Sequence, residues 1–319
     1  MAHVDPGTAA PIEAPEISIV VPAFNEADNL RELARRVAEV LGNLGATWEV
    51  VIADDGSRDC TWKTITELHD QDYRFRGVRL SRNFGHQYAL LAGLLHARGR
   101  AVISMDADLQ HPPSLIPVLV DHWKKGSKIV HTKRRDPEHV PFLKRLTSRW
   151  FYRLFSSLSG IALTDGMADF RLLDRQVVNE LARFPEEGLF LRGITQWIGF
   201  PSSVVSFDCG ERFAGKTKYN FRRMLKFAWH GVSSFSLVPL RIAIGIGVAC
   251  TVLSFVAILY AILGKFLDGH SVPGWASVIA LTSFFFGLLF FFLALLAEYI
   301  GRILIEVRGR PRFIVSDEI

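Results

Sequence analysis

The chain has 319 residues, enough for a catalytic domain and a smaller second part, and 49% of them are hydrophobic. Its formal net charge of +5 does not require a nucleic-acid partner, because anionic lipids and phosphate-bearing substrates also attract a basic protein. The three cysteines are isolated in the sequence, which excludes a cysteine zinc site and fits a reducing compartment.

The first half of the chain alternates between strand and helix patterns. It begins with residues 1–16, which lack the apolar core of a signal peptide and are predicted to form a flexible leader. Strands are predicted at 17–21 (broken by Pro22), 48–54, 75–81 and 101–108. Helices are predicted at 27–45 (ending near Gly42 or Gly45), 60–72 and 85–99. This alternation predicts an α/β fold with a mainly parallel sheet and helices on both faces.

Polar residues follow each of the four predicted strands. They are Asn25 and Glu26, Asp54 and Asp55, Ser81 to Asn83, and Asp106 with Asp108. Parallel strands end at the same edge of a sheet, and ligands bind there in such folds. The sequence therefore predicts one polar rim that carries the functional site.

The segment VISMDADLQHPP, residues 102–113, suggests a cation site on this rim. Asp106, Asp108 and Gln110 alternate, so an extended chain would point all three side chains to one side. Oxygen ligands suit a hard divalent cation, Mg²⁺ or Mn²⁺. The alternative is a solvated loop whose two aspartates cap a helix.

Two segments are long and apolar enough to cross a membrane. The 23 residues from Ile242 to Gly264 and the 27 from Ser271 to Ala297 carry no charge. A buried helical hairpin of a soluble domain is the alternative, but a soluble helix should show a polar stripe. Lysines and arginines flank the pair on both outer sides, which predicts that both chain ends, and the α/β domain, lie on the cytoplasmic side of the plasma (inner) membrane.

Six motifs in order carry a resemblance to a known family: VPAFNE, DDGS, SRNFGHQ, DADLQHPP, DGMADFRLLDR and RFAGKTKY. With the two apolar segments, they make the chain resemble inverting family 2 glycosyltransferases of the GT-A fold. Within that family it looks like the polyprenyl-phosphate glycosyltransferases, which include bactoprenol glucosyltransferases and dolichol-phosphate mannose synthase. The resemblance implies a GT-A catalytic domain at 17–215, juxtamembrane amphipathic helices at 216–239, a transmembrane hairpin at 240–300 and a cytoplasmic tail at 301–319.

The resemblance also assigns roles to individual positions. Residues matched to nucleotide-sugar binding are Pro22, Phe24, Asn25, Glu26, Asp54, Asp55, Arg82, Asp106, Arg212 and Lys218, with Lys216 less secure. Metal binding is assigned to Asp106, Asp108 and Gln110, for Mg²⁺ or Mn²⁺. The catalytic positions are Asp106, Asp108, Asp165 and Asp169, where the last two are candidate bases or, alternatively, orient Arg171 or cap a turn. Neither His86 nor His111 has a metal-ligating partner at the usual spacing, so both are predicted to be supporting or surface residues.

A basic amphipathic helix is predicted within residues 142–158, which suits a membrane interface or, alternatively, a solvated domain surface. The resemblance assigns the grip on the acceptor phosphate to Arg134, Arg145 and Ser148. The expected reaction transfers a hexose to undecaprenyl phosphate. UDP-glucose is the expected donor and GDP-mannose the alternative. A homo-oligomer is also expected.

Two other functions remain as alternatives. A processive polysaccharide synthase would need several membrane helices and a QxxRW motif, and TQWIGF at residues 195–200 is not that motif. A non-catalytic, membrane-anchored nucleotide-binding protein would not need the metal residues together with a basic helix.

Overall fold

The computed structural model describes residues 14–134, 167–184, 191–207, 240, 243–250, 252–253, 255–256 and 274–319. The chain divides into two compact units. The first comprises residues 1–152, 162–218 and 310–319, and the second comprises 153–161 and 219–309. Each unit is described by itself.

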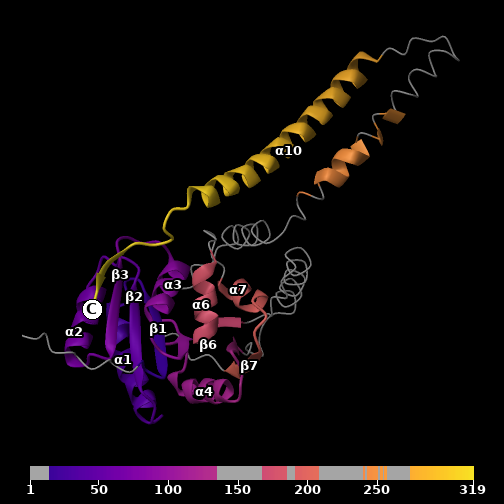
Figure 1. The fold of residues 1–319 in the computed structure, drawn as a ribbon. Coiled ribbons are helices and arrows are strands. Elements are labelled where there is room, and N and C mark those ends of the chain that lie inside the picture. The colour runs from indigo at the N-terminus through magenta and orange to yellow at the C-terminus, as the bar shows by residue number, and fades with distance from the viewer. Residues whose placement is uncertain are drawn as a thin grey trace, which may run out of the picture. The chain divides into compact units, whose positions relative to one another are not determined.

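From β1 to β4 the described strands and helices follow one another as the sequence predicts, and the elements after β4 were not predicted (Figure 1). The strands are β1 (Ile17–Ala23), β2 (Trp48–Asp54), β3 (Phe75–Leu80), β4 (Ala101–Ser104), β5 (Ile129–Arg134), β6 (Met167–Asp174), β7 (Ser202–Phe207) and β8 (Val315–Glu318). The helices are α1 (Ala27–Gly42), α2 (Thr61–Gln71), α3 (His86–His96), the short 3₁₀ helix η1 (Pro113–Leu115), α4 (Ile116–Lys124), α6 (Arg175–Arg183), α7 (Leu191–Trp197) and α10 (Trp275–Arg308).

The strands of the first unit form one sheet in the order β7-β5-β6-β4-β1-β2-β3-β8. β1 pairs in parallel with both β2 and β4, and β2 pairs in parallel with β3. β6 and β8 run antiparallel to their neighbours, and β7 is parallel to β5. The prediction of a mainly parallel sheet is confirmed, and the four strands that precede the polar motifs end at one edge.

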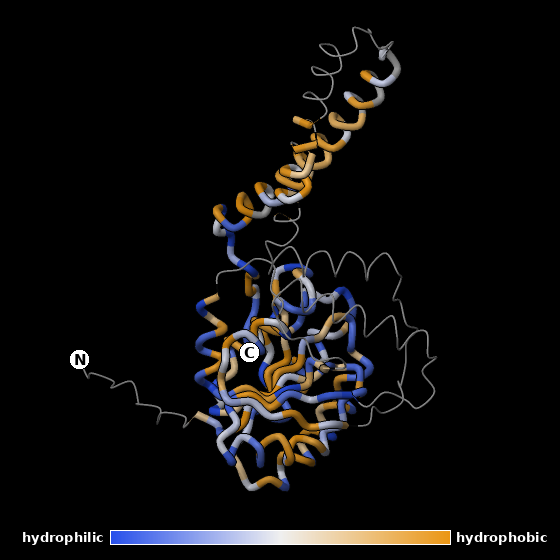
Figure 2. Tube along the Cα trace, turned by 90° about the vertical axis from the view of Figure 1, so that its right-hand side faces the viewer, coloured by the Kyte–Doolittle hydropathy of each residue, from blue (hydrophilic) through white to orange (hydrophobic). Residues whose placement is uncertain are grey.

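Helices cover both faces of this sheet. The larger apolar cluster joins alternate residues of β1 and β2, such as Ile19 and Ile52, to Leu33 of α1, Ile65 of α2 and Leu119 of α4. A smaller cluster lies on the opposite face, where Ala89 and Ala92 of α3 meet Ala53 and Leu80. Figure 2 shows the central strands largely in the hydrophobic colour and hydrophilic segments around them. The two-faced burial explains why the strands are apolar throughout rather than alternating.

Two predicted strand ends are wrong. β1 continues through Pro22 to Ala23, paired with β2. The carbonyl of Val20 accepts from the Met105 N–H on the β4 side, and Pro22 faces that same side, beyond the last residue paired with β4. Its missing N–H therefore costs no ladder hydrogen bond. β4, by contrast, ends at Ser104, before the carboxylates.

The C-terminal residues are not only a tail. β8 adds an antiparallel edge strand to β3, so residues 315–318 belong to the sheet and residues 310–319 to the first unit. The paired backbone of Gly77 and Ile319 exchanges two hydrogen bonds of 3.0 Å. No alternation of apolar residues in VSDE suggested a strand, because an edge strand gains its stability from backbone pairing as much as from burial.

Among the described residues of the second unit, one helical stretch, Phe284–Arg308 of α10, is long and apolar enough to cross a membrane by length and composition. It overlaps the predicted second span, 271–297, from residue 284 onward and continues beyond it to Arg308. The predicted first span is described in part, at positions 243–250, 252–253 and 255–256, and all of these positions are helical.

Candidate active site

A cavity of about 380 Å³ opens at the carboxyl ends of β1, β2 and β4, next to the start of α3. It is lined by Pro22, Ala23, Phe24, Glu26, Asp55, Asn83, Gly85, His86, Ala89, Asp106, Ala107 and Asp108. These residues come from all four motifs that were predicted to share the rim. The tertiary structure thus brings the motifs together around one pocket.

The end of β1 is held in a turn that an ordinary residue rarely adopts. Asn25 has a positive φ of 56°, which costs energy for a residue other than glycine. Its N–H donates to the Ser57 hydroxyl at 2.9 Å, and its side-chain oxygen accepts from the Arg58 N–H at 3.0 Å. The Glu26 N–H donates to the Thr61 hydroxyl in the same way. These bonds fix the turn, and Phe24 and Glu26 line the cavity.

Asp54 and Asp55 at the end of β2 are both buried, and burial raises the pKa of each carboxyl. One oxygen of Asp54 accepts from the Ser57 N–H at 3.0 Å, while its Oδ2 has no hydrogen-bond partner. The Arg79 guanidinium lies near that oxygen, with its Nε 3.5 Å away. A buried oxygen without a hydrogen bond is costly, so Asp54 can accept one from a ligand.

Asp55 clamps the loop before α3. Its carboxylate accepts from the Phe84 N–H at 2.7 Å and from the Gly85 N–H at 2.9 Å. The backbone of this loop passes so close to Gly56 that a Cβ there would lie 2.5 Å from the Arg82 carbonyl carbon, and Gly56 also has a positive φ of 64°. The DDGS motif therefore builds the loop that forms one wall of the cavity.

The chain turns after β4, so the predicted extended alternation of Asp106, Asp108 and Gln110 is wrong. Residues 107–109 form a turn and bend in which Leu109 has a positive φ of 63°. The Gln110 N–H donates to the Asp108 carboxylate at 3.1 Å, a bond typical of an Asp-led turn. Asp106 and Asp108 both face the cavity all the same.

Asp106 lies among two histidines and a second carboxylate. His86 Nε2 is 3.5 Å from its Oδ1, and His111 Nε2 is 3.8 Å from its Oδ2. His111 is buried, stacks on Phe170, and accepts the Asp106 N–H at Nδ1, which leaves the ring proton on Nε2. Burial raises the pKa of the Asp106 carboxyl and lowers the pKa of His111. Both histidines support Asp106, and the surface alternative is wrong for His111.

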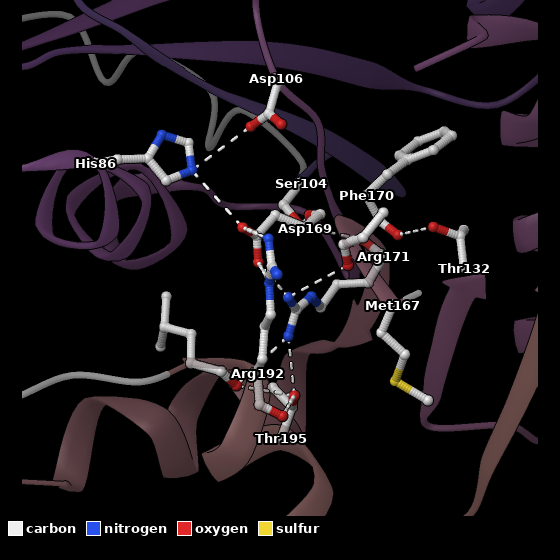
Figure 3. Close-up of polar contacts among 12 residues, drawn as sticks. His86, Ser104, Asp106, Thr132, Met167, Asp169, Phe170, Arg171, Arg192 and Thr195 are labelled. Carbon is white, nitrogen blue, oxygen red and sulfur yellow. Dashed lines mark hydrogen bonds and ion pairs between the residues drawn. The ribbon is translucent and has the colours of Figure 1, made fainter. Parts of the chain in front are cut away.

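Asp169 is held by two arginines (Figure 3). Arg171 donates to its Oδ1 at 2.5 Å, and Arg192 donates to both carboxylate oxygens at 2.9 and 2.6 Å. Burial alone would raise the pKa of Asp169, but the hydrogen bonds from Arg192 and the charge of Arg171 hold it well below its usual range. Figure 3 shows the His86 ring pointing between Asp106 and Asp169, at 3.5 and 3.9 Å. The hydrogen bond between Arg171 and Asp169 agrees with the alternative that Asp169 orients Arg171.

The carboxylates of the rim fit a divalent cation. Oδ1 of Asp106 is buried and lacks a hydrogen-bond partner, and Asp108 faces the same cavity. Within the described ranges, no three His, Cys, Asp or Glu side chains lie close enough to hold an ion by themselves. Mg²⁺ commonly uses one or two carboxylates and completes its coordination with substrate phosphates and water. Two carboxylates beside an open cavity match that pattern.

Several predicted site residues are placed away from the cavity lining or are not described. Arg82 is exposed, with its guanidinium 4.3 Å from the Phe84 ring centre, and Arg134 is exposed at the end of β5. Asp165, Arg145, Ser148, Arg212, Lys216 and Lys218 lie outside the described residues. The sequence reasoning missed Arg192, which stands in no recognised motif. Only its contact with Asp169 reveals it.

A family model described as Glycosyl transferase family 2 matches residues 18–182, which is more than half of the chain. The chain belongs to glycosyltransferase family 2. The protein is therefore a glycosyltransferase, and its α/β fold with a mostly parallel sheet is GT-A-like.

Relatives match this glycosyltransferase over nearly its whole length. A glycosyltransferase of Synechocystis is 40% identical over 95% of each chain. The bactoprenol glucosyl transferase of Shigella phage SfII is 38% identical over 94% of this chain and 97% of its own. A solved structure, the glucosyl-3-phosphoglycerate synthase of Mycobacterium tuberculosis with Mn²⁺ and UDP, is 16% identical, covers 67% of this chain and 76% of its own, and has a TM-score of 0.45.

Proposed function

We propose that the protein transfers glucose from UDP-glucose to the phosphate of a polyprenyl phosphate, with undecaprenyl phosphate as the acceptor. The observation that carries this proposal is the near full-length match to bactoprenol glucosyl transferases, at 37–38% identity over 94–95% of the chain. The match extends beyond the catalytic domain and includes the region that holds α10. A shared catalytic domain alone would not favour a lipid acceptor.

The donor would occupy the cavity at the carboxyl ends of β1, β2 and β4. Phe24, Glu26 and Asp55 line this cavity and would contact the nucleoside. Asn25 and Asp54 are not among the lining residues, and the resemblance implies that they join in binding it. The free oxygen of Asp54 would accept a hydrogen bond from the base or ribose. Arg82, Arg212 and Lys218 would contribute positive charge, as the resemblance implies.

Asp106, Asp108 and Gln110 would hold Mg²⁺ or Mn²⁺ together with the donor diphosphate. A bound divalent cation neutralises charge on the departing diphosphate. Around it, His86 and His111 keep the Asp106 carboxylate in place, and the depth of Asp106 in the cavity keeps bulk water from its Oδ1. These residues would direct the sugar carbon toward the acceptor with inversion.

The acceptor phosphate needs little activation, since a phosphate monoester has its second pKa near 6 and is largely dianionic at neutral pH. We assign Asp169 the role of orienting Arg171 and not that of a base. Two arginines keep its carboxylate ionised, and both of its oxygens already accept hydrogen bonds from them. The base role predicted for Asp165 stays a prediction. Arg134, Arg145 and Ser148 would bind the acceptor phosphate. We place the reaction at the cytoplasmic face of the plasma membrane, with two spans and both termini in the cytoplasm.

The test is a panel of nucleotide sugars with Mn²⁺ and undecaprenyl phosphate in detergent. We expect a glucosyl lipid from UDP-glucose, with loss of activity in EDTA and recovery with Mn²⁺. If product forms from GDP-mannose alone, the donor is GDP-mannose and not UDP-glucose, while the assignment of polyprenyl phosphate as the acceptor stands. Formation of a long polysaccharide, or transfer only to water-soluble acceptors, would overturn the proposal.

A further inference from the structure

The C-terminal residues pack against the loop that forms the donor cavity. The carbonyl of Ile314 accepts from the Ser81 N–H at 2.9 Å, directly where β3 ends and the loop begins. Phe313 and Val315 pack on the small cluster of Ala53, Leu80, Ala89 and Ala92, as does Phe84 of the loop. Two sets of contacts therefore hold the loop. The Asp55 carboxylate binds its backbone N–H groups, and residues 313–315 pack beside it.

The same segment also contacts the arginine nearest to Asp54. Arg79 lies opposite Asp317 in the register of β3 and β8, with Nη1 4.0 Å from the Asp317 carboxylate. The Ser316 hydroxyl donates to the Arg79 carbonyl at 3.3 Å. On the other side, the Arg79 guanidinium is 3.5 Å from the Asp54 Oδ2 that lacks a hydrogen-bond partner. Asp317 and Asp54 thus hold Arg79 between them.

We propose that residues 313–317 are positioning residues of the donor site. They would act through two groups that the nucleotide approaches, namely the loop of Asn83 and Gly85 and the Asp54–Arg79 pair. The register of β8 is shifted between Arg79 and Leu80, which is where the strand meets both groups. A bulge at such a place re-aims side chains and is typical of edges near active sites. The proposal rests on the proposed function only for the identity of the nucleotide.

The supports differ in their expected strength. Phe313 is partly buried in an apolar cluster, and removing its ring leaves the outer side of the loop without packing. A small displacement of a binding loop can cost one to two orders of magnitude in function. The ion pair of Asp317 with Arg79 is long, and the Asp317 side chain is 52% exposed, so we expect only a small effect from it.

The first experiment measures binding of UDP with Mn²⁺ to the full-length Phe313→Ala variant by calorimetry. We expect the Kd to rise about tenfold, with the KM for undecaprenyl phosphate unchanged. Phe313→Leu should restore most of the affinity, because it refills the cluster. Phe75→Ala is the matched control: it removes a buried ring from the opposite end of β3, so it should lower thermal stability without raising the Kd.

The second experiment compares Asp317→Asn with Asp121→Asn. Each carboxylate has an ion pair on the surface, but Asp121 pairs with Lys125 on α4 and not with Arg79. We expect about a twofold rise in the Kd for UDP with Asp317→Asn and none with the control. The Phe313→Ala result is decisive, because its expected effect is larger.

An unchanged UDP affinity in a folded Phe313→Ala variant would overturn the proposal, as would equal losses in Phe75→Ala. GDP with Mn²⁺ is measured in parallel. If the wild-type protein binds GDP and not UDP, the proposed donor is wrong, and the same variants are then judged with GDP. A failure of the function and a failure of the positioning role therefore give different results.

Discussion

The two ends of the parallel strands carry buried charges that are satisfied to different degrees. At the amino ends, Glu49 accepts from the Ser18 hydroxyl and the Arg98 N–H, both at 2.6 Å, and from Arg76 at 3.1 Å. Arg76 also donates to the His96 carbonyl and to Glu318. At the carboxyl ends, Asp54 and Asp106 each keep a buried oxygen without a hydrogen bond.

Backbone strain separates the same two ends. The only residues other than glycine with positive φ in the described chain, Asn25 and Leu109, follow β1 and β4 at the carboxyl rim. Strain and unpaired polar atoms persist only where something else offsets their cost, and ligand binding is the usual reason. The amino-end network serves the fold, whereas the carboxyl rim gives up stability for a site. The predictions below test this division.

The largest effect is expected at the rim. Asp108→Ala should abolish transfer, a loss of more than about 10³-fold, because Asp108 faces the cavity and is a proposed metal ligand. The melting temperature should fall only slightly, since the side chain supports no core packing and accepts a single turn hydrogen bond from the Gln110 N–H. Activity assays with Mn²⁺ measure the loss of transfer, and thermal melts measure the melting temperature. Wild-type turnover with intact metal dependence would refute the assignment.

The amino end should respond in the opposite way. Glu49→Gln removes a buried charge and leaves Arg76 poorly compensated, so the free energy of unfolding should fall by about 3–5 kcal/mol. The kcat of the folded fraction should be nearly that of the wild type. Urea titration with activity measured below the transition separates the two quantities. A loss of kcat without a loss of stability would contradict the division between the ends.

The buried histidine of β5, His131, predicts a pH effect on stability. Burial, together with the charge of Arg171, lowers the pKa of His131 to about 4. The unfolded chain, with a histidine pKa near 6.5, binds a proton that the folded state refuses, so stability is lost as pH falls from about 6.5 to about 4. The free energy of unfolding is measured at pH 7 and at pH 4.5 for both proteins. Its decrease between the two pH values should be about 2 kcal/mol smaller in His131→Gln than in the wild type. Equal losses in both proteins would show that His131 is not the group responsible.

The smallest effect concerns the residue that only the structure reveals. Arg192→Ala removes two hydrogen bonds to Asp169 while Arg171 remains, so we expect about a tenfold loss in kcat/KM. Lysine at this position should rescue only in part, since an ammonium cannot make the bidentate contact. Steady-state kinetics with the donor and acceptor varied in turn provide the measurement. Full activity in Arg192→Ala would show that Asp169 needs no second arginine.

The sequence by itself determined the order of the strands and helices from β1 to β4, and the polar rim that follows these strands. Apolar runs such as Ile17–Val21 and the stripe of α1 are local patterns, and parallel strands necessarily end at one edge. It could not give the turn at Asp106 to Gln110, because a two-residue alternation is meaningful only while the chain stays extended, and the strand ends at Ser104.

Only the tertiary structure decided which distant residues meet. His86, Asp106, Asp169 and Arg192 come from four separate segments of the chain, and their distances follow from the packing of α3 and α7 around the sheet. β8 joins β3 from more than 230 residues away, as the Arg76–Glu318 pair shows. A local pattern predicts the state of its own segment. Pairing between remote segments depends on backbone hydrogen bonds and on shape, which no local pattern encodes.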